Sequence, residues 1–147
     1  MTNGKDNVAI SRYTKKAYLM ARILEMVPFL RCIILNGSLA RGTASEKSDI
    51  DLLIIAKSGR IFSVRLLANF LTIMLGQKRP RDENKSHAGK FCLNYFLTDQ
   101  YLKIGVVKGR ERECAESYGN SILIWGDEKV FRKFLEANRI LFLSFQI

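Results

Sequence analysis

The spacing of apolar residues changes along this chain, and each spacing predicts a different element. Over residues 11–27, apolar side chains return every three or four positions with basic residues between them, which predicts an amphipathic helix that ends at Pro28. Two continuous apolar runs follow, at Leu30–Leu35 and within residues 49–56. Runs of this length without alternation are typical of strands that are covered on both faces of a sheet.

The rest of the chain combines further helices and strands with one long polar loop. Residues 60–76 have helical spacing and are so rich in Leu and Phe that we expect burial on more than one side. The other expected elements are a loose arm over 1–10, a polar loop over 78–90, a strand over Phe91–Leu97, a charged helix over 109–118, a short apolar run over 122–125, and a helix from Glu128 to about Phe145 capped by Asp127. The apolar end, residues 140–147, is expected to pack into the core or to form a protein interface.

Length and cysteine content favour a single domain in a reducing compartment. A chain of 147 residues with 48% hydrophobic residues can bury one core, so we expect one domain over residues 1–147. Cys32, Cys92 and Cys114 lack metal-site spacing, and we expect free thiols. The N-terminus has no signal-peptide core and no apolar segment is long enough to cross a bilayer, so we expect a cytoplasmic protein with no membrane partner.

Basic residues are in excess, with 24 Lys and Arg against 14 Asp and Glu and a formal net charge of +10. This excess favours a polyanionic partner, either nucleic acid or a nucleotide, although a solvated basic surface fits the charge equally well. The polar loop could close over a triphosphate or follow an RNA strand, or it could be solvated. Its basic residues are Lys78, Arg79, Arg81, Lys85 and Lys90.

A turn of small residues joins the first two predicted strands and leads to a pair of acids. Gly37 and Ser38 follow the first strand, and Asp49 and Asp51 begin the second. Because side chains alternate along a strand, the two carboxylates lie on one face, where their repulsion costs stability unless a cation sits between them. Such oxygen ligands suit Mg²⁺, which also binds phosphates, and the turn can present N–H groups and a hydroxyl to those phosphates.

The sequence Gly-Ser-Leu-Ala-Arg-Gly at 37–42, followed by Ser-Asp-Ile-Asp at 48–51, resembles the signature of the polymerase-β-like nucleotidyltransferase superfamily. Within it, the similarity is greatest to the small, single-domain minimal nucleotidyltransferases. The order of elements extends the resemblance over about residues 12–100, which leaves 109–147 as a C-terminal helical extension. The resemblance implies an α+β fold of the polymerase-β palm type, in which a mixed β-sheet is flanked by helices.

The same resemblance implies an activity and the residues that perform it. Gly37 and Ser38 would hold the β- and γ-phosphates of a nucleoside triphosphate (NTP), and Arg41 would contact phosphate or support the turn. Asp49 and Asp51 would be catalytic ligands of Mg²⁺ or Mn²⁺, while an acceptor hydroxyl attacks the α-phosphorus and pyrophosphate leaves. The acceptor stays open between protein, RNA and small molecules. Relatives of this kind often act with a separate helical partner, so a helical protein partner or a homo-oligomer is also implied.

One catalytic position departs from the family pattern. Active members carry a third carboxylate on a later strand, and the predicted strand Phe91–Leu97 contains no Asp or Glu. Cys92, Asn94 and Phe96 are expected to share the relevant face, and Asn94 is the expected catalytic substitute, with Asp99 as an alternative. Asn94 offers a neutral oxygen to a metal but cannot act as a base. The chain is therefore expected to be an active nucleotidyltransferase, or a nucleotide- or nucleic-acid-binding member without transfer activity.

Overall fold

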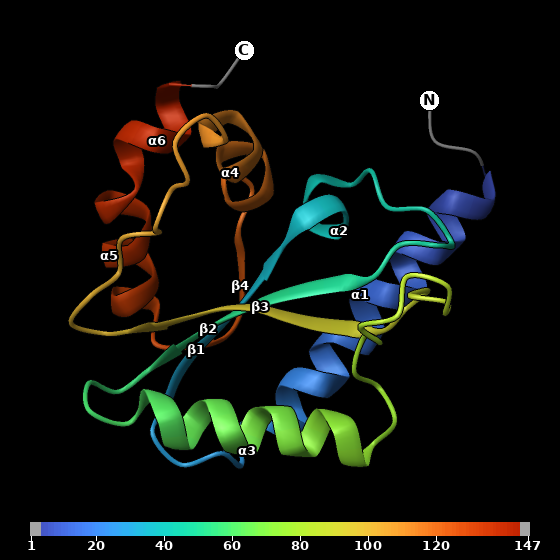
Figure 1. Cartoon of the computed structure of the whole chain (residues 1–147), viewed down its shortest axis with the longest axis horizontal. Coiled ribbons are helices and arrows are strands. Elements are labelled where there is room, and N and C mark those ends of the chain that lie inside the picture. The colour runs from blue at the N-terminus through green and yellow to red at the C-terminus, as the bar shows by residue number, and fades with distance from the viewer. Residues whose placement is uncertain (1–3, 145–147) are drawn as a thin grey trace.

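The computed structural model describes residues 4–144, which form a four-stranded sheet with helices packed against it (Figure 1). The strands lie in the order β3-β2-β1-β4, with β1 antiparallel to both β2 and β4, and β3 parallel to β2. In chain order the elements are α1 (Gly4–Leu24), β1 (Leu30–Asn36), α2 (Gly37–Arg41), β2 (Ile50–Ala56), α3 (Ile61–Met74), β3 (Phe91–Thr98), α4 (Glu111–Tyr118), β4 (Ile122–Gly126), α5 (Glu128–Ala137) and α6 (Arg139–Ser144). The expected α+β fold, a mixed sheet flanked by helices, is confirmed.

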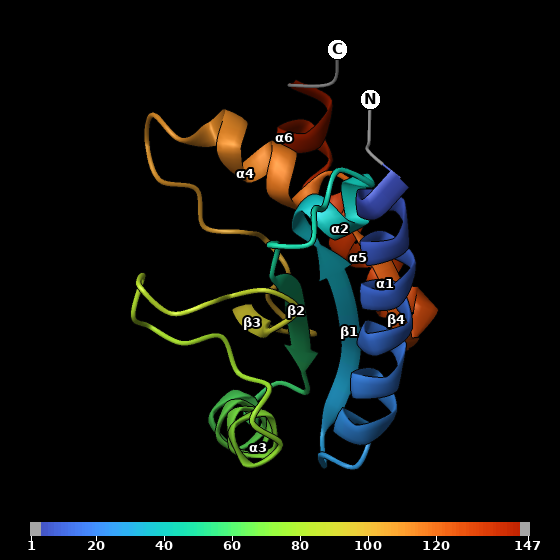
Figure 2. The same cartoon turned by 90° about the vertical axis from the view of Figure 1, so that its right-hand side faces the viewer.

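The two central strands supply side chains to a core on each face of the sheet. Ile33 and Leu35 pack with α1 and α3, whereas Cys32 and Ile34 pack with α4, α5 and α6. Helix α1 runs along β1 (Figure 2). Because both faces are covered, β1 and β2 read in the sequence as continuous apolar runs.

Helix α1 begins earlier than the sequence predicts. The expected loose arm over residues 1–10 is wrong from Gly4 onward, because Ala9 packs in the core at 1% exposure. Tyr13, also buried, donates a hydrogen bond from its hydroxyl to the Glu46 carbonyl at 2.5 Å. These contacts hold the first turns of the helix against the rest of the domain. None of the helices within residues 4–144 is long and apolar enough to cross a membrane.

Helix α3 is buried along one side only. Val64, Ala68 and Thr72 are its buried residues. The expected burial on further sides is wrong, because no layer covers the outer face within the described residues. That face is a stripe of exposed apolar side chains, made by Phe62, Leu66, Phe70, Ile73 and Met74.

The expected final helix is divided in two at Asn138. Asp127 caps α5 as predicted, accepting bonds from the backbone N–H groups of Lys129 and Val130. The buried Asn138 side chain then accepts a bond from Ile104 N and donates to the Leu102 carbonyl. These bonds draw the chain toward the β3–α4 connection, and α6 follows as a separate helix. Residues 145–147 lie outside the described part of the chain.

Candidate active site

The small-residue turn and the acid pair meet at one end of the β1–β2 pair. Strand β1 ends at Asn36, and the antiparallel register places Asn36 opposite Asp51. Helix α2 starts at the next residue, Gly37, so the turn lies directly beside Asp51. The two segments that the sequence motif groups together are therefore neighbours in space.

Gly37 leaves the space that the Asp51 carboxylate occupies. Its φ is +68°, a conformation that L side chains rarely adopt. A Cβ atom at this position would overlap Oδ2 of Asp51. Gly42, at the other end of α2, also has a positive φ, but a Cβ there would meet open space. Gly37 is thus required by its contact with Asp51 as well as by its backbone conformation.

The other two candidate residues of the turn have different surroundings. Helix α2 already starts at Gly37, and its N-cap Asn36 makes no side-chain cap bond, so Ser38 lies inside the helix and not at its cap. Within residues 4–144 the Ser38 hydroxyl has no hydrogen-bond partner, which leaves it available to a ligand. Arg41 donates a 3.0 Å bond from Nη1 to the Glu116 carbonyl and so ties α2 to α4. A phosphate contact by Arg41 stays a prediction.

The two acids lie close together at the start of β2. Asp49 directly precedes the strand and Asp51 is its second residue. Burial, and then the charge of Asp49, raise the pKa of Asp51 to about 6. The positive charge of Arg79 and a hydrogen bond from Cys92 act in the opposite direction. Ionising both carboxylates therefore costs electrostatic free energy, and a cation bound beside them would lower that cost.

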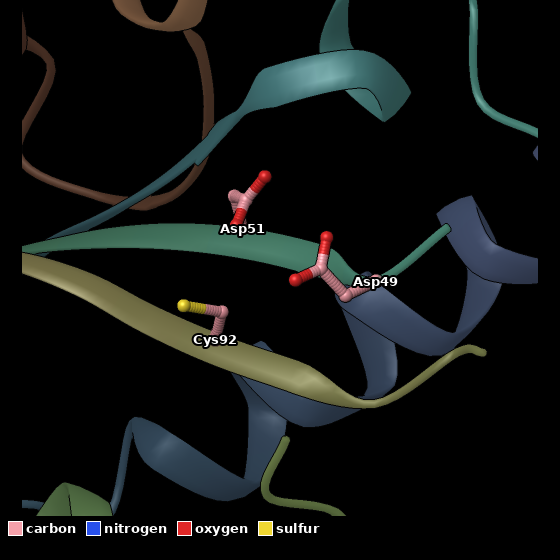
Figure 3. Close-up of side chains that lie close together, drawn as sticks. All are labelled: Asp49, Asp51 and Cys92. Atoms are coloured by element: carbon pink, nitrogen blue, oxygen red, sulfur yellow. The ribbon is translucent and has the colours of Figure 1, made fainter. Parts of the chain in front are cut away.

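Cys92, on the neighbouring strand, completes a group of three possible ligands. The parallel register places Cys92 opposite Asp51. Ligand atoms of Asp49, Asp51 and Cys92 all lie within 4.8 Å of one another (Figure 3). Cys92 is a free thiol, as are the other two cysteines, in agreement with the sequence. The side chain beside the acid pair is thus a thiol rather than a third carboxylate.

The register of β3 changes the expected position of Asn94. The pairing shifts between Leu93 and Tyr95, so Asn94 lies in an irregularity, and Cys92 rather than Asn94 stands across from Asp51. The expectation that Phe96 shares a face with Cys92 is also wrong, because Phe96 packs on the α1 side of the sheet. The Asn94 Oδ1 atom is buried without a hydrogen-bond partner. A catalytic role for Asn94 stays a prediction.

Arg79 contacts the site, although the sequence places it only among the basic residues of a loop. Its Nη1 atom lies 2.9 Å from Oδ2 of Asp49, and its guanidinium also donates to Cys92. The Nε atom donates a 3.1 Å bond to Nδ1 of His87. The loop reaches the site because Arg79 N donates to the carbonyl of Phe91 at 2.8 Å, beside β3. The guanidinium therefore provides the positive charge beside the acid pair.

The chemistry of the three ligands fits a divalent cation. The two carboxylates are hard oxygen donors of the kind that Mg²⁺ and Mn²⁺ prefer. A thiolate at Cys92 would favour softer ions. The absence of a Cβ at Gly37 lets the Asp51 carboxylate lie directly against the turn. Asp49, Asp51 and Cys92 could therefore hold an ion, for which Arg79 would have to release Asp49.

A family model and a solved structure are similar to this chain. A model of the family described as nucleotidyltransferase domain matches residues 20–139. No curated protein matches the chain. A solved structure described as the crystal structure of the toxin-antitoxin with AMP-PNP is similar at 16% identity and a TM-score of 0.43, over 88% of this chain and 89% of that chain. Since the family model spans most of the chain and includes the turn, the acid pair and Cys92, the protein belongs to the nucleotidyltransferase domain family.

Proposed function

We propose that this protein transfers a nucleoside monophosphate from an NTP to an acceptor hydroxyl, with Mg²⁺ or Mn²⁺ held by Asp49 and Asp51. The observation that carries the proposal is the contact between Gly37 and Asp51, since it joins a turn suited to phosphates with an acid pair suited to a cation. Membership of the nucleotidyltransferase domain family supports the same class of reaction.

The residues of the turn would bind and orient the triphosphate. Backbone N–H groups at Gly37 and Ser38, with the free Ser38 hydroxyl, donate to the β- and γ-phosphates. A cation held by Asp49 and Asp51 would supply positive charge that offsets the charge developing on the phosphate oxygens. The acceptor oxygen forms a bond to the α-phosphorus, and the bond from this phosphorus to the bridging oxygen breaks, so that pyrophosphate leaves with the electron pair. Arg79, released from Asp49, is then free to contact a phosphate.

Cys92 favours a second candidate function, nucleotide or nucleic-acid binding without transfer. Burial and the charges of Asp51 and Asp49 raise the pKa of the Cys92 thiol, so it brings no negative charge at neutral pH. A carboxylate in this position would bind the cation and could accept the proton of the acceptor hydroxyl. With a thiol there, binding can be retained while transfer is slowed.

Incubation with α-phosphate-labelled NTP tests both candidates. The protein is supplied with Mg²⁺ or Mn²⁺ and with RNA, protein or small hydroxyl compounds as acceptors, and NTP binding is measured in parallel. We expect the wild-type protein to transfer label and the Asp49→Asn plus Asp51→Asn variant to lose this activity. The control variant Glu136→Ala, which changes an exposed acid on α5, should retain it. Binding without transfer would support the second candidate. Absence of both would contradict the two candidates together.

The exposed stripe of α3 supports the protein partner that the resemblance implies. Phe62 is 82% exposed and Leu66 is 71% exposed, and both lie on the same side of the helix. A contiguous apolar face of this kind is typical of protein interaction sites. We expect a helical protein or a second copy of the chain to cover it, and light scattering of wild type and Leu66→Lys would detect self-association.

A further inference from the structure

A hollow of about 520 Å³ lies beside β3, where α3 and the loop that precedes β3 come together. Strand β3 lies at one edge of the sheet, and the beginning of the loop pairs with it at Lys78 and Phe91. Phe91 N donates to the Gln77 carbonyl at 2.7 Å, and Arg79 N donates to the Phe91 carbonyl at 2.8 Å. These bonds bring loop and helix side chains together over one strand edge. We call this the basic hollow, after the residues that line it.

Positive charge in the basic hollow is largely uncompensated by the protein. Its charged lining consists of Arg65, Lys78, Arg79 and Arg81, with Glu83 as the single acid. Among residues 4–144, only Arg79 of these cations forms an ion pair, with Asp49. Lys78 donates instead to the neutral side chain of Asn69 at 2.8 Å. The uncompensated positive charge of the hollow therefore favours binding of an anion.

The basic hollow and the phosphate-binding turn approach the acid pair from different strands. Arg79 and Cys92 line the hollow and also contact Asp49 and Asp51, which joins the hollow to the site. Gly37 follows β1, on one side of β2, while the hollow lies beside β3, on the other side. If the turn binds the triphosphate, the hollow is the side from which an acceptor can reach it.

We propose that the basic hollow binds the end of a single-stranded nucleic acid, whose terminal hydroxyl is the acceptor. The inference rests on the proposed function, because it names the acceptor of that reaction. The terminal hydroxyl oxygen forms the bond to the α-phosphorus of the NTP, pyrophosphate leaves with the electron pair of the broken bond, and the hydroxyl proton is released to water. The product is a strand that is longer by one nucleotide.

The chemistry of the lining favours this acceptor over other classes. Several cations in one hollow repel polycationic small molecules such as amino sugars and attract the regularly spaced phosphates of a strand. The Arg65 guanidinium lies over the Phe96 ring, 5.7 Å from its centre, and offers a flat cationic surface to a base. Near the other end of the same loop, Arg12 and Lys16 line a second hollow with Gly89. Positive charge is thus found near both ends of the loop.

The test compares oligonucleotide binding with nucleotide binding in matched variants of the full chain. Arg65→Gln plus Arg81→Gln removes two charges from the basic hollow. Arg132→Gln plus Lys133→Gln removes the same charge from exposed positions on α5. Fluorescence anisotropy of a labelled single-stranded RNA, and of DNA with the same sequence, is followed over a range of salt concentrations. Binding of a non-hydrolysable NTP with Mg²⁺ is measured in parallel.

We expect the hollow variant to bind the oligonucleotide about tenfold or more weakly and to lower the salt slope by about one to two, since each phosphate contact contributes somewhat less than one. The α5 variant and the NTP affinity of both variants should stay close to wild type. A preference for RNA over DNA would identify RNA as the source of the strand, and equal binding would leave either as acceptor.

Equal oligonucleotide affinity in the two variants would overturn the inference. So would a loss of NTP affinity in the hollow variant, since the nucleotide itself would then occupy the hollow. Label transfer to protein in preference to either oligonucleotide would also overturn it. In each of these cases the proposed function still stands, because it fails only if the wild-type protein transfers no label to any acceptor.

Discussion

Cys92 of β3 lies directly opposite Asp51 of β2, at the position from which a third carboxylate would complete the acid pair. The pKa of this thiol is raised by burial and by the two neighbouring acids, so the thiol is neutral at physiological pH. The site therefore has the cation-binding charge of two carboxylates. This relationship decides how strongly the site binds a divalent ion and whether it can assist the acceptor hydroxyl.

Replacement of Cys92 by aspartate should restore the missing charge. We expect Cys92→Asp to bind Mn²⁺ about tenfold more tightly, a gain on the order of 1.4 kcal/mol, because a third carboxylate adds attraction for the ion. Without a divalent ion, the same variant should be less stable than wild type because three acids then repel one another. Calorimetric titration with Mn²⁺ and urea unfolding measure the two effects. Cys92→Ser, which adds no charge, should show neither effect.

The sulfur of Cys92 should make the site accept softer ions. With Co²⁺ we expect a thiolate-to-metal charge-transfer absorption, because binding a soft ion displaces the thiol proton. The band should be absent in Cys92→Ser and retained in Cys114→Ser, in which the changed residue lies on α4. A band that survives in Cys92→Ser would place the bound ion elsewhere in the chain.

Asp51 should make the metal-free protein less stable as pH rises. Its pKa is about 6 in the folded protein against an ordinary value of 3.8, so the folded state binds the proton more tightly than the unfolded state. The free energy of unfolding should therefore fall between about pH 4 and pH 6, by at most about 3 kcal/mol from this group. Urea unfolding across this range measures the change. Asp51→Asn should flatten it, whereas Glu136→Gln should leave it as in wild type.

Gly37 and Gly42 allow the contact with Asp51 to be separated from backbone strain. Both have positive φ, and alanine at either position costs roughly 1–2 kcal/mol for the conformation alone. Only at Gly37 does the added Cβ also overlap Asp51. We expect Gly37→Ala to be clearly less stable than Gly42→Ala in thermal unfolding and to lose NTP binding. Equal stability of the two variants would show that the overlap with Asp51 does not contribute to the loss of stability in Gly37→Ala.

The strands and the acid pair could be predicted because their signals are local. Continuous apolar runs encode β1 and β2, which are buried on both faces, and the Gly-Ser turn with Asp49 and Asp51 lies within a short stretch of sequence. The cap at Asp127 was equally local, since its carboxylate binds N–H groups two and three residues ahead. Each of these predictions needed only neighbouring residues.

The features that the sequence did not reveal depend on contacts between distant segments. The identity of the residue opposite Asp51 depends on the parallel register of β3 and on its shift before Tyr95, which alternation along a single strand does not reveal. Aligning the beginnings of the two strands, Ile50 with Phe91, would have found Cys92. Arg79 enters the site only through the bonds between its loop and β3. The early start of α1 likewise depends on burial of Ala9 against the rest of the core.

A crystal structure of the protein with Mg²⁺ and a non-hydrolysable NTP would locate the cation and the triphosphate together. We expect a cation bound by Asp49 and Asp51, the triphosphate against Gly37 and Ser38, and Arg79 released from Asp49. The same electron density would show whether Cys92 or Asn94 contacts the ion. A triphosphate held in the basic hollow, with no ion at the acid pair and the Arg79–Asp49 pair intact, would contradict the proposed roles of the turn and the acid pair.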